Sequence, residues 1–203
     1  MPKKRLTRDD KREANRSRIL VAAGTVFGRR GYHGATIEEI ADEAGLSNGA
    51  VYYNFESKED LFLGLLERWR AELLREVETT LGRLDRGDAG PAALRDAVRS
   101  IVDTVKPSRD WRLLLLEFVT YAARNPKFRA RFVVGREKFK SALTDALEHR
   151  TLAAGLEPRI PAEHQALLLT ALVNGLSVEE LTDPGSVPDE LLGEAIDAFL
   201  EPS

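Results

Sequence analysis

Residues 36–54, TIEEIADEAGLSNGAVYYN, decide the fold, because they predict two short helices joined by a tight turn. Thr36 and Glu39 form a capping box, in which a hydroxyl and a carboxylate satisfy backbone N–H groups at the start of a helix over residues 37–44. Gly45 ends that helix because glycine accepts the left-handed conformation. Ser47 is placed as the N-cap of a second helix over residues 48–54. Two short helices across such a turn are typical of a helix-turn-helix.

The second of these helices has a slender outward face. With Val51 as its buried centre, a rotation of about 100° per residue defines which positions point outward. They are Gly49, Ala50 and Tyr53, flanked by Asn48 and Asn54. Small residues let such a helix enter a major groove about 12 Å wide, where amides and hydroxyls bond base edges or phosphates. Helix pairs of this kind also serve as plain packing elements, so the pattern alone leaves both interpretations open.

Composition places the chain among soluble globular proteins. Hydrophobic residues make up 43% and charged residues 31% of its 203 residues. No stretch approaches the ~20 apolar residues of a membrane span, and the N-terminal segment lacks the apolar part of a secretory signal. The absence of cysteine excludes disulfide and thiolate chemistry and fits a reducing compartment. We therefore expect a cytoplasmic protein.

Charge is unevenly distributed along the chain. The 30 basic and 33 acidic side chains give a net charge of −3, which by itself argues weakly against a nucleic-acid-binding protein. Residues 1–18, however, hold eight basic and three acidic side chains, so this segment carries +5 and the rest carries −8. The hypothesis is that this basic arm contacts phosphates or a flanking minor groove; a merely solvated tail is the alternative.

The rest of the sequence is helical in pattern, with no sustained alternation of the strand type. Apolar periodicity predicts a helix over residues 13–30, ended by Gly31, and a long helix that begins at Ser57. Turn signals separate further helices over residues 91–106, 108–124, 126–154, 161–181 and 188–201. The expected fold is all-α with about nine helices: residues 1–56 are the basic arm and a three-helix helix-turn-helix domain, and residues 57–203 are a larger helical ligand-binding and dimerisation domain.

Residues 18–66 closely resemble the DNA-binding domain of the TetR/AcrR family of transcriptional regulators. Four motifs carry the resemblance: AA-x-x-x-F from Ala22, G-Y-x-x-A-T from Gly31, I-A-x-x-A-G-x-S from Ile40, and G-x-x-Y-Y-x-F-x-S-K-x-x-L from Gly49. They cover about a quarter of the chain, and the remainder matches the family only in length and helix count.

The resemblance implies roles for individual residues of the domain. It places Thr36 and Lys58 against phosphates, makes Tyr53 a clamp on the DNA backbone, and divides Tyr52 between packing and a groove contact. A cation in the first turn of a helix opposes the helix dipole, so stability gives little reason for Lys58. The predicted base-reading positions are Asn48, Gly49, Ala50 and Asn54. Thr36, Ser47 and Ser57 have a simpler interpretation as helix caps, which we favour for Ser57.

The last two helices are expected to form a homodimer, since one recognition helix reads few base pairs and pairs of them lie about 34–36 Å apart. In the TetR family the terminal helices form a four-helix bundle across a two-fold axis. The residues expected at this interface are Leu168, Leu172, Gly175, Leu176, Leu192, Ile196 and Phe199. The alternative for the same residues is packing within one chain.

The central helices of the family usually enclose a small-molecule pocket. The candidate walls are Trp69, Trp111, Phe118, Tyr121, Phe132 and Phe139, and the candidate polar anchors are Glu117 and Asn174. Aromatic residues at helical spacing also form ordinary cores. A carboxylate in a buried stretch needs a partner, and for Glu117 an arginine such as Arg112 is one candidate.

No pattern in the sequence indicates an enzyme, a metal site or a cofactor. His33, His149 and His164 are isolated, and residues 175–178 lack the second glycine of a nucleophile elbow. The resemblance therefore implies a homodimeric repressor that a small-molecule ligand releases from a palindromic operator in double-stranded DNA. The alternative is an architectural or chromosome-associated DNA-binding protein that needs no ligand.

Overall fold

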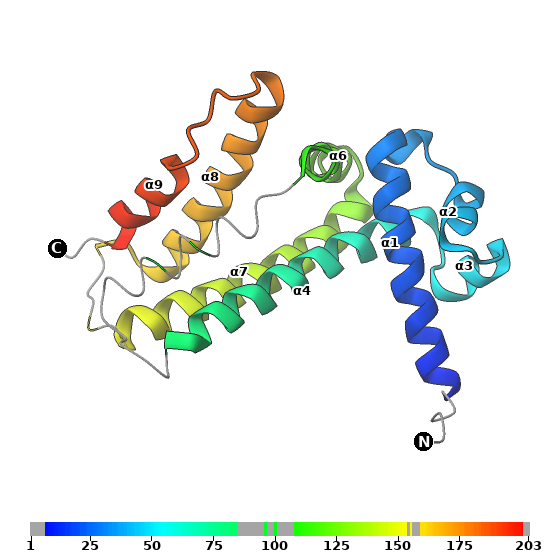
Figure 1. The fold of residues 1–203 in the computed structure, drawn as a ribbon, viewed down its shortest axis with the longest axis horizontal. Helices are drawn as coiled ribbons and strands as arrows, with labels where there is room; N and C mark the ends of the chain where they lie inside the picture. Colours follow the sequence, from blue (N-terminus) through cyan, green and yellow to red (C-terminus); the bar gives the residue numbers. More distant parts are fainter. Residues whose placement is uncertain are drawn as a thin grey trace. The chain divides into compact units, whose positions relative to one another are not determined.

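A computed structural model describes residues 7–84, 96, 100, 108–153, 155 and 159–200, and for residues 81–84, 150, 153, 196, 197, 199 and 200 it describes the backbone only. Its helices are α1 (Arg8–Gly34), α2 (Ile37–Ala44), α3 (Asn48–Asn54), α4 (Lys58–Leu84), α6 (Arg109–Arg124), α7 (Pro126–Ala153), α8 (Ala162–Thr182) and α9 (Leu191–Leu200) (Figure 1). No strand occurs in these ranges, so the predicted all-α fold is confirmed. The helix predicted over residues 91–106 lies outside the described residues, except that Asp96 and Ser100 are helical.

The first helix begins earlier than the sequence pattern predicts. Thr7 is its N-cap, and the Thr7 hydroxyl and the Asp10 carboxylate form a second capping box with the backbone N–H groups of Asp10 and Thr7. Residues 8–12, which we assigned to a basic arm, are therefore helical. Periodicity missed this start because the first turns of α1 are exposed and carry no apolar stripe.

Gly31 ends the first and longer helix of α1, as the sequence predicts. Its φ of 69° and ψ of 170° are not helical, and one further turn, which is counted with α1, continues from there to Gly34. The break leaves the N–H of Tyr32 free of the helical ladder, and the Glu117 carboxylate of α6 accepts it at 2.5 Å. A Cβ atom at Gly31 would lie 2.8 Å from Oε1 of Glu117. Glycine is thus required here by both backbone conformation and close approach.

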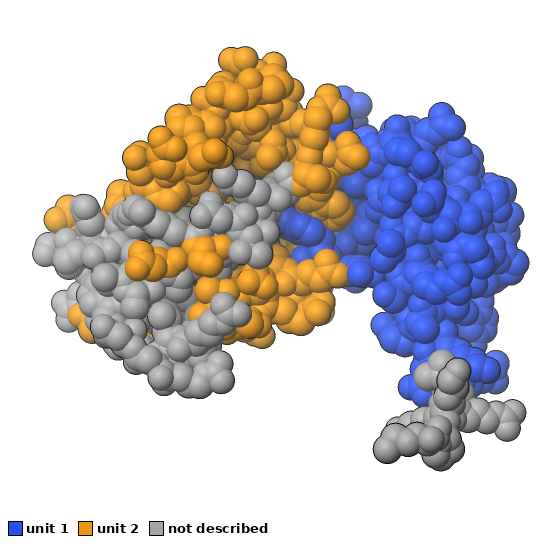
Figure 2. Space-filling model, in the orientation of Figure 1, with its two compact units in different colours: residues 1–69, 113–132 blue, residues 70–112, 133–203 orange. Residues whose placement is uncertain are grey.

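The chain forms two compact units (Figure 2). Unit 1 is Met1–Trp69 with Leu113–Phe132, and unit 2 is Arg70–Arg112 with Val133–Ser203. The division falls inside α4, α6 and α7, so these three helices contribute to both units. The sequence-based boundary after Glu56 stays a prediction.

A cluster of aromatic rings forms the core of unit 1. Phe62 of α4 is at its centre, with its ring centroid 3.8 Å from that of Phe118, 4.5 Å from Tyr32 and 5.2 Å from Phe27. Phe118 and Phe27 are fully buried. Such ring pairs add about 0.5–1.5 kcal/mol each beyond the burial of their area. Part of α6 therefore completes the core around which α1 is packed.

Unit 2 contains α8, α9 and the later part of α7. The ammonium group of Lys140 on α7 contacts the carboxylates of Glu137, at 3.1 Å, and Glu163 of α8, at 3.3 Å. These hydrogen bonds raise the pKa of Lys140. Among the described helices, none is long and apolar enough to cross a membrane.

Replacing Gly31 with alanine tests the kink. Gly31→Ala should lower the free energy of unfolding by more than about 1–2 kcal/mol, because a left-handed L-residue costs that much before the contact with Glu117 is counted. Urea denaturation followed by circular dichroism measures it.

Gly34→Ala is the matched control. Its Cβ would meet only the Cβ of Arg30, at 3.7 Å, so the unfolding free energy should stay within about 0.5 kcal/mol of the original chain. Equal effects of the two substitutions would contradict the account of the kink.

Candidate nucleic-acid interface

The turn between α2 and α3 has the geometry of a helix C-cap followed by an N-cap. Gly45 has φ 61° and ψ 41°, in the left-handed region. The Leu46 N–H bonds the carbonyl of Ala41 at 2.9 Å, and the Ser47 hydroxyl accepts the N–H of Ala50 at 3.2 Å. These contacts fix the path of the chain into α3, as the sequence predicts.

The hydroxyls of Thr36 and Ser57 are also caps. Thr36 accepts the N–H of Glu39 at 3.2 Å, and Ser57 accepts the N–H of Asp60 at 3.0 Å. The capping prediction is confirmed for Thr36, Ser47 and Ser57. Both Thr36 and Ser47 are exposed; the Thr36 hydroxyl donates to the Glu39 carboxylate at 3.5 Å, and the Ser47 hydroxyl also has a proton to donate. Their predicted contacts with DNA stay predictions.

One face of α3 is open to solvent. Tyr52 is 56% and Tyr53 59% exposed, which is unusual for large aromatic side chains. Asn48 and Gly49 are exposed and Ala50 is half-buried, whereas Val51 is 1% exposed and anchors the opposite face. Asn48, Gly49 and Tyr53 agree with the predicted outward face, Ala50 does so only in part, and Asn54 does not.

Asn54 is buried, so its assignment to the base-reading face is wrong. It is 8% exposed, and its Nδ2 donates to the carbonyl of Ala50 at 2.8 Å. It follows Val51 by three residues, a spacing that brings both side chains to the same face of a helix. Its Oδ1 accepts no hydrogen bond from the described residues.

Lys58 points into the domain. Its Nζ donates to the carbonyl oxygens of Tyr32 at 2.8 Å and Ala35 at 3.0 Å, and it lies 4.6 Å from the ring centroid of Tyr32. Carbonyls at the end of a helix lack intrahelical partners and carry partial negative charge. Contrary to the expectation from the helix dipole, stability does give a reason for Lys58, because it caps α1. Its phosphate contact stays a prediction.

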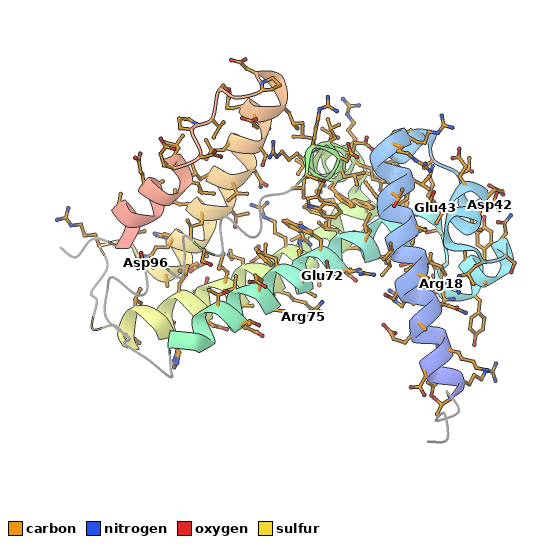
Figure 3. All side chains as sticks on the ribbon, in the orientation of Figure 1. Arg18, Asp42, Glu43, Glu72, Arg75 and Asp96 are labelled. Carbon is orange, nitrogen blue, oxygen red and sulfur yellow. The ribbon has the colours of Figure 1, made fainter. Side chains whose placement is uncertain are left out.

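Two arginines of α1 cap the other two helices of the domain. Nη1 of Arg16 donates to the carbonyl of Asn54 at 3.1 Å, and its guanidinium lies 4.3 Å from the ring centroid of Phe55. Nη2 of Arg18 donates to the carbonyl of Ala44 at 2.7 Å, beside α2 (Figure 3). The C-terminal ends of α1, α2 and α3 are thus each held by a cation from another part of the chain. Neither role is visible in the sequence pattern, because the carbonyls that these arginines bind are 38 and 26 residues away along the chain.

The positive charge near the N-terminus therefore has two uses. Arg16 and Arg18 bind carbonyls of the domain, while Arg8, Lys11 and Arg12 are exposed. The hypothesis of a basic surface for DNA now rests on these three residues of α1 and on residues 1–6, which lie outside the described part of the chain.

Three of the candidate ligand residues contact other residues of unit 1. The Glu117 carboxylate accepts the backbone N–H of Tyr32, so its partner is not the arginine we suggested. Phe118 is 0% exposed and stacks on Phe62. The Tyr121 hydroxyl donates to the Glu59 carboxylate of α4. Phe118 is therefore a core residue, the alternative that the sequence left open, and the half-buried Tyr121 joins α6 to α4.

Tyr32, whose ring lies next to that of Tyr121, stays neutral. Burial, together with the hydrogen bond to the Tyr121 hydroxyl, raises the pKa of Tyr32. Its ring centroid lies 4.8 Å from that of Tyr121. The connection between α1 and α6 therefore does not depend on titration of this phenol.

The other candidate ligand residues are divided between the units. Trp69 and Phe132 of unit 1 and Trp111 and Phe139 of unit 2 are half-buried. Asn174 is exposed on α8. Its assignment as a polar anchor in the interior of a single chain is therefore wrong. Among the described residues, no group of His, Cys, Asp and Glu could hold a metal ion.

The candidate dimer residues lie on α8 and α9. Leu168 and Gly175 are exposed, and Leu172, Leu176 and Leu192 are half-buried. The side chains of Ile196 and Phe199 lie outside the described residues.

Lys58→Met tests the cap on α1. Methionine keeps the apolar stem but removes two charge-assisted hydrogen bonds, so the free energy of unfolding should fall by roughly 1.5–3 kcal/mol. Urea denaturation measures the change. Lys127→Met removes an exposed lysine of unit 1 and should cost less than about 0.5 kcal/mol. A loss no larger than that of the control would show that the cap contributes nothing.

Two family models match the chain. Residues 19–65 match the model of bacterial regulatory proteins of the tetR family. Residues 90–202 match the model of the C-terminal part of BetI-type transcriptional repressors, which spans more than half of the chain.

The curated relatives include both an activator and a repressor of transcription. The chain is 32% identical over 181 residues to the HTH-type transcriptional activator FasR of Mycolicibacterium smegmatis, an alignment that covers 86% of this chain and 72% of the relative. It is 28% identical over 167 residues to the HTH-type transcriptional repressor AcnR of Corynebacterium efficiens, with 82% and 81% covered.

A solved structure shares the fold. The crystal structure of a transcriptional regulator from Saccharomonospora viridis in complex with choline has a TM-score of 0.64 and 26% identity, covering 92% of this chain and 95% of that one. The exposed face of α3 on a capped helix-turn-helix fits these matches. The chain belongs to the TetR family of DNA-binding transcriptional regulators, which are not enzymes, and has a BetI-type C-terminal domain.

Proposed function

We propose that the protein is a homodimeric repressor that binds a palindromic operator through α3 and leaves it when a small molecule binds the C-terminal domain. The observation that carries DNA binding is the exposed α3 face, in which Tyr52 and Tyr53 are more than half exposed while Val51 fixes the helix from behind. A solvent-facing helix of small and hydrogen-bonding residues suits a major groove.

An exposed apolar face of α8 supports the homodimer. Leu168 is 42% exposed, and nothing lies within 4 Å of the position that a Cβ atom would take at Gly175. The exposed positions on this helix include Leu167, Leu168, Ala171, Asn174 and Gly175, which recur at helical spacing. Apart from the polar Asn174, these positions are apolar or glycine, and exposed apolar surface of this kind marks an interaction site. A second copy bound there would present two α3 helices to one side of a duplex.

The ligand that we propose first is a quaternary ammonium compound. The S. viridis relative was solved with choline, and aromatic side chains bind such cations through their ring faces. Among the described residues, the half-buried aromatic candidates are Trp69, Tyr121 and Phe132 in unit 1, and Trp111 and Phe139 in unit 2.

Release requires that the ligand favour one arrangement of the dimer over another. Helix α4 contributes residues to both units, and Lys58 in its first turn contacts α1. A ligand that shifts α4 would therefore act on the DNA-binding domain. A coupling of about 1–3 kcal/mol would change operator affinity roughly 5–150-fold.

Activation of transcription, in place of repression, is the second candidate function. One relative is named an activator, and both signs require the same binding to DNA. A reporter gene behind the operator distinguishes them, because loss of the protein raises transcription from a repressed promoter and lowers it from an activated one. A ligand-independent architectural protein would instead bind many chromosomal sites.

The proposal is tested with the purified full-length chain. Footprinting on the DNA upstream of its own gene should protect a palindrome, and choline at millimolar concentration should weaken that binding within the roughly 5–150-fold range. Protection without a palindrome, or binding that choline leaves unchanged, would contradict the operator or the ligand class respectively.

Sedimentation of a matched pair of variants tests the dimer in the same samples. Leu168→Glu puts a charge on the exposed α8 face and should give monomers that lose affinity for the palindrome. Leu152→Glu introduces the same charge at a 72% exposed leucine of α7 and should leave a dimer. Dimers in both variants would exclude the α8 face as the interface.

A further inference from the structure

The N-terminal part of α1 presents a basic face that extends beyond the matched DNA-binding domain. The family model begins at residue 19, whereas α1 begins at Arg8. Arg8, Arg12 and Arg16 follow one another at intervals of four residues, which places them along one face of the helix. Asp10 is not at one of these four-residue intervals, and its carboxylate accepts the Thr7 N–H at 2.8 Å in the capping box.

Arg16 fixes the direction of that face. Because its guanidinium bonds the carbonyl of Asn54 at 3.1 Å, the face is turned towards the C-terminal end of α3. Arg12 is one helical turn, about 5.4 Å, nearer the N-terminus along the same face. Arg12 therefore lies beside α3 but N-terminal to the part of α1 that packs against α3.

Arg12 contacts the recognition helix through a ring and not through a carboxylate. Its guanidinium carbon lies 5.7 Å from the ring centroid of Tyr53. Both side chains are exposed, Tyr53 by 59%. Among the described residues, Arg12 makes no hydrogen bond or ion pair. An arginine held at an aromatic ring keeps its N–H donors available, and these donors match the oxygens of a phosphate.

We propose that Arg12 and Tyr53 form one phosphate-binding pair, in which Tyr53 holds the guanidinium and Arg12 binds the DNA backbone beside the groove that α3 enters. The inference rests on the proposed function, since it needs a duplex on the exposed face of α3. It extends the DNA-binding surface from the helix-turn-helix to the start of α1. A phosphate contact positions the protein and carries no sequence information.

Salt dependence identifies a phosphate contact directly. With the full-length chain and a fluorescent operator duplex, log K is measured against log salt between 50 and 200 mM. Because an operator-bound dimer carries two copies of Arg12, Arg12→Gln should reduce the magnitude of the slope by about 1.8, so that the variant loses about 12-fold less affinity than the original chain over this range. A scrambled duplex should show the same reduction in slope, because phosphates are common to both.

Three further variants separate the causes. Lys138→Gln removes one charge at an exposed lysine of unit 2 and should leave the slope unchanged. Arg16→Gln should weaken binding with an unchanged slope, because Arg16 positions α3 and touches no phosphate. In a Tyr53→Ala background, Arg12→Gln should change the slope less than it does in the original chain. Circular dichroism melting shows that each variant is folded.

The outcomes distinguish a failure of the phosphate-binding pair from a failure of the proposed DNA-binding function. If the original chain binds no duplex, both fail. If it binds and Arg12→Gln has the original slope, with or without lower affinity, only the phosphate pair is overturned. A Lys138→Gln variant that matches Arg12→Gln would also overturn it, because the effect would then be one of net charge.

Discussion

Everything that this protein can do with DNA depends on a helix too short to hold itself in place. Helix α3 has seven residues, and an isolated helix of that length is unstable in water. Val51 and Phe55 bury its inner side, and Arg16 binds the carbonyl of Asn54 at its end. The same solution recurs in its neighbours, where Arg18 binds the end of α2 and Lys58 the end of α1. Long cationic side chains satisfy carbonyls that the helices cannot satisfy themselves.

This use of charge connects stability to function. The cations that hold the three helices come from α1 and α4, so the position of α3 depends on both. Helix α6, which lies within the region matched by the BetI-type model, bonds α1 through Glu117 and α4 through Tyr121. The core of unit 1 is thus built partly from the sequence of the C-terminal family domain. That arrangement puts part of the BetI-type region in direct contact with the helices that support α3.

Local signals in the sequence were sufficient for the helix-turn-helix. The capping box at Thr36, the left-handed Gly45 and the N-cap Ser47 act within a few residues, and α2 and α3 have the predicted bounds. The roles of Arg16, Lys58 and Glu117 depend on partners 38, 26 and 85 residues away, which no periodicity reveals. Asn54 differs, because its spacing from Val51 already placed it on the buried face. The sequence could not predict which bases and phosphates α3 contacts or which ligand the C-terminal domain takes. Those contacts depend on the DNA and on the ligand as well as on the chain.

Hydrogen exchange in the full-length protein tests the dependence of α3 on Arg16 most directly. Arg16→Gln removes a charge-assisted bond worth about 1.5–3 kcal/mol, so amides of residues 51–55 should exchange about tenfold faster or more while those of α8 keep their rates. Arg29→Gln breaks the exposed pair with Glu43 and should leave α3 unchanged. Unaltered exchange in α3, or the same acceleration in α8, would contradict the account.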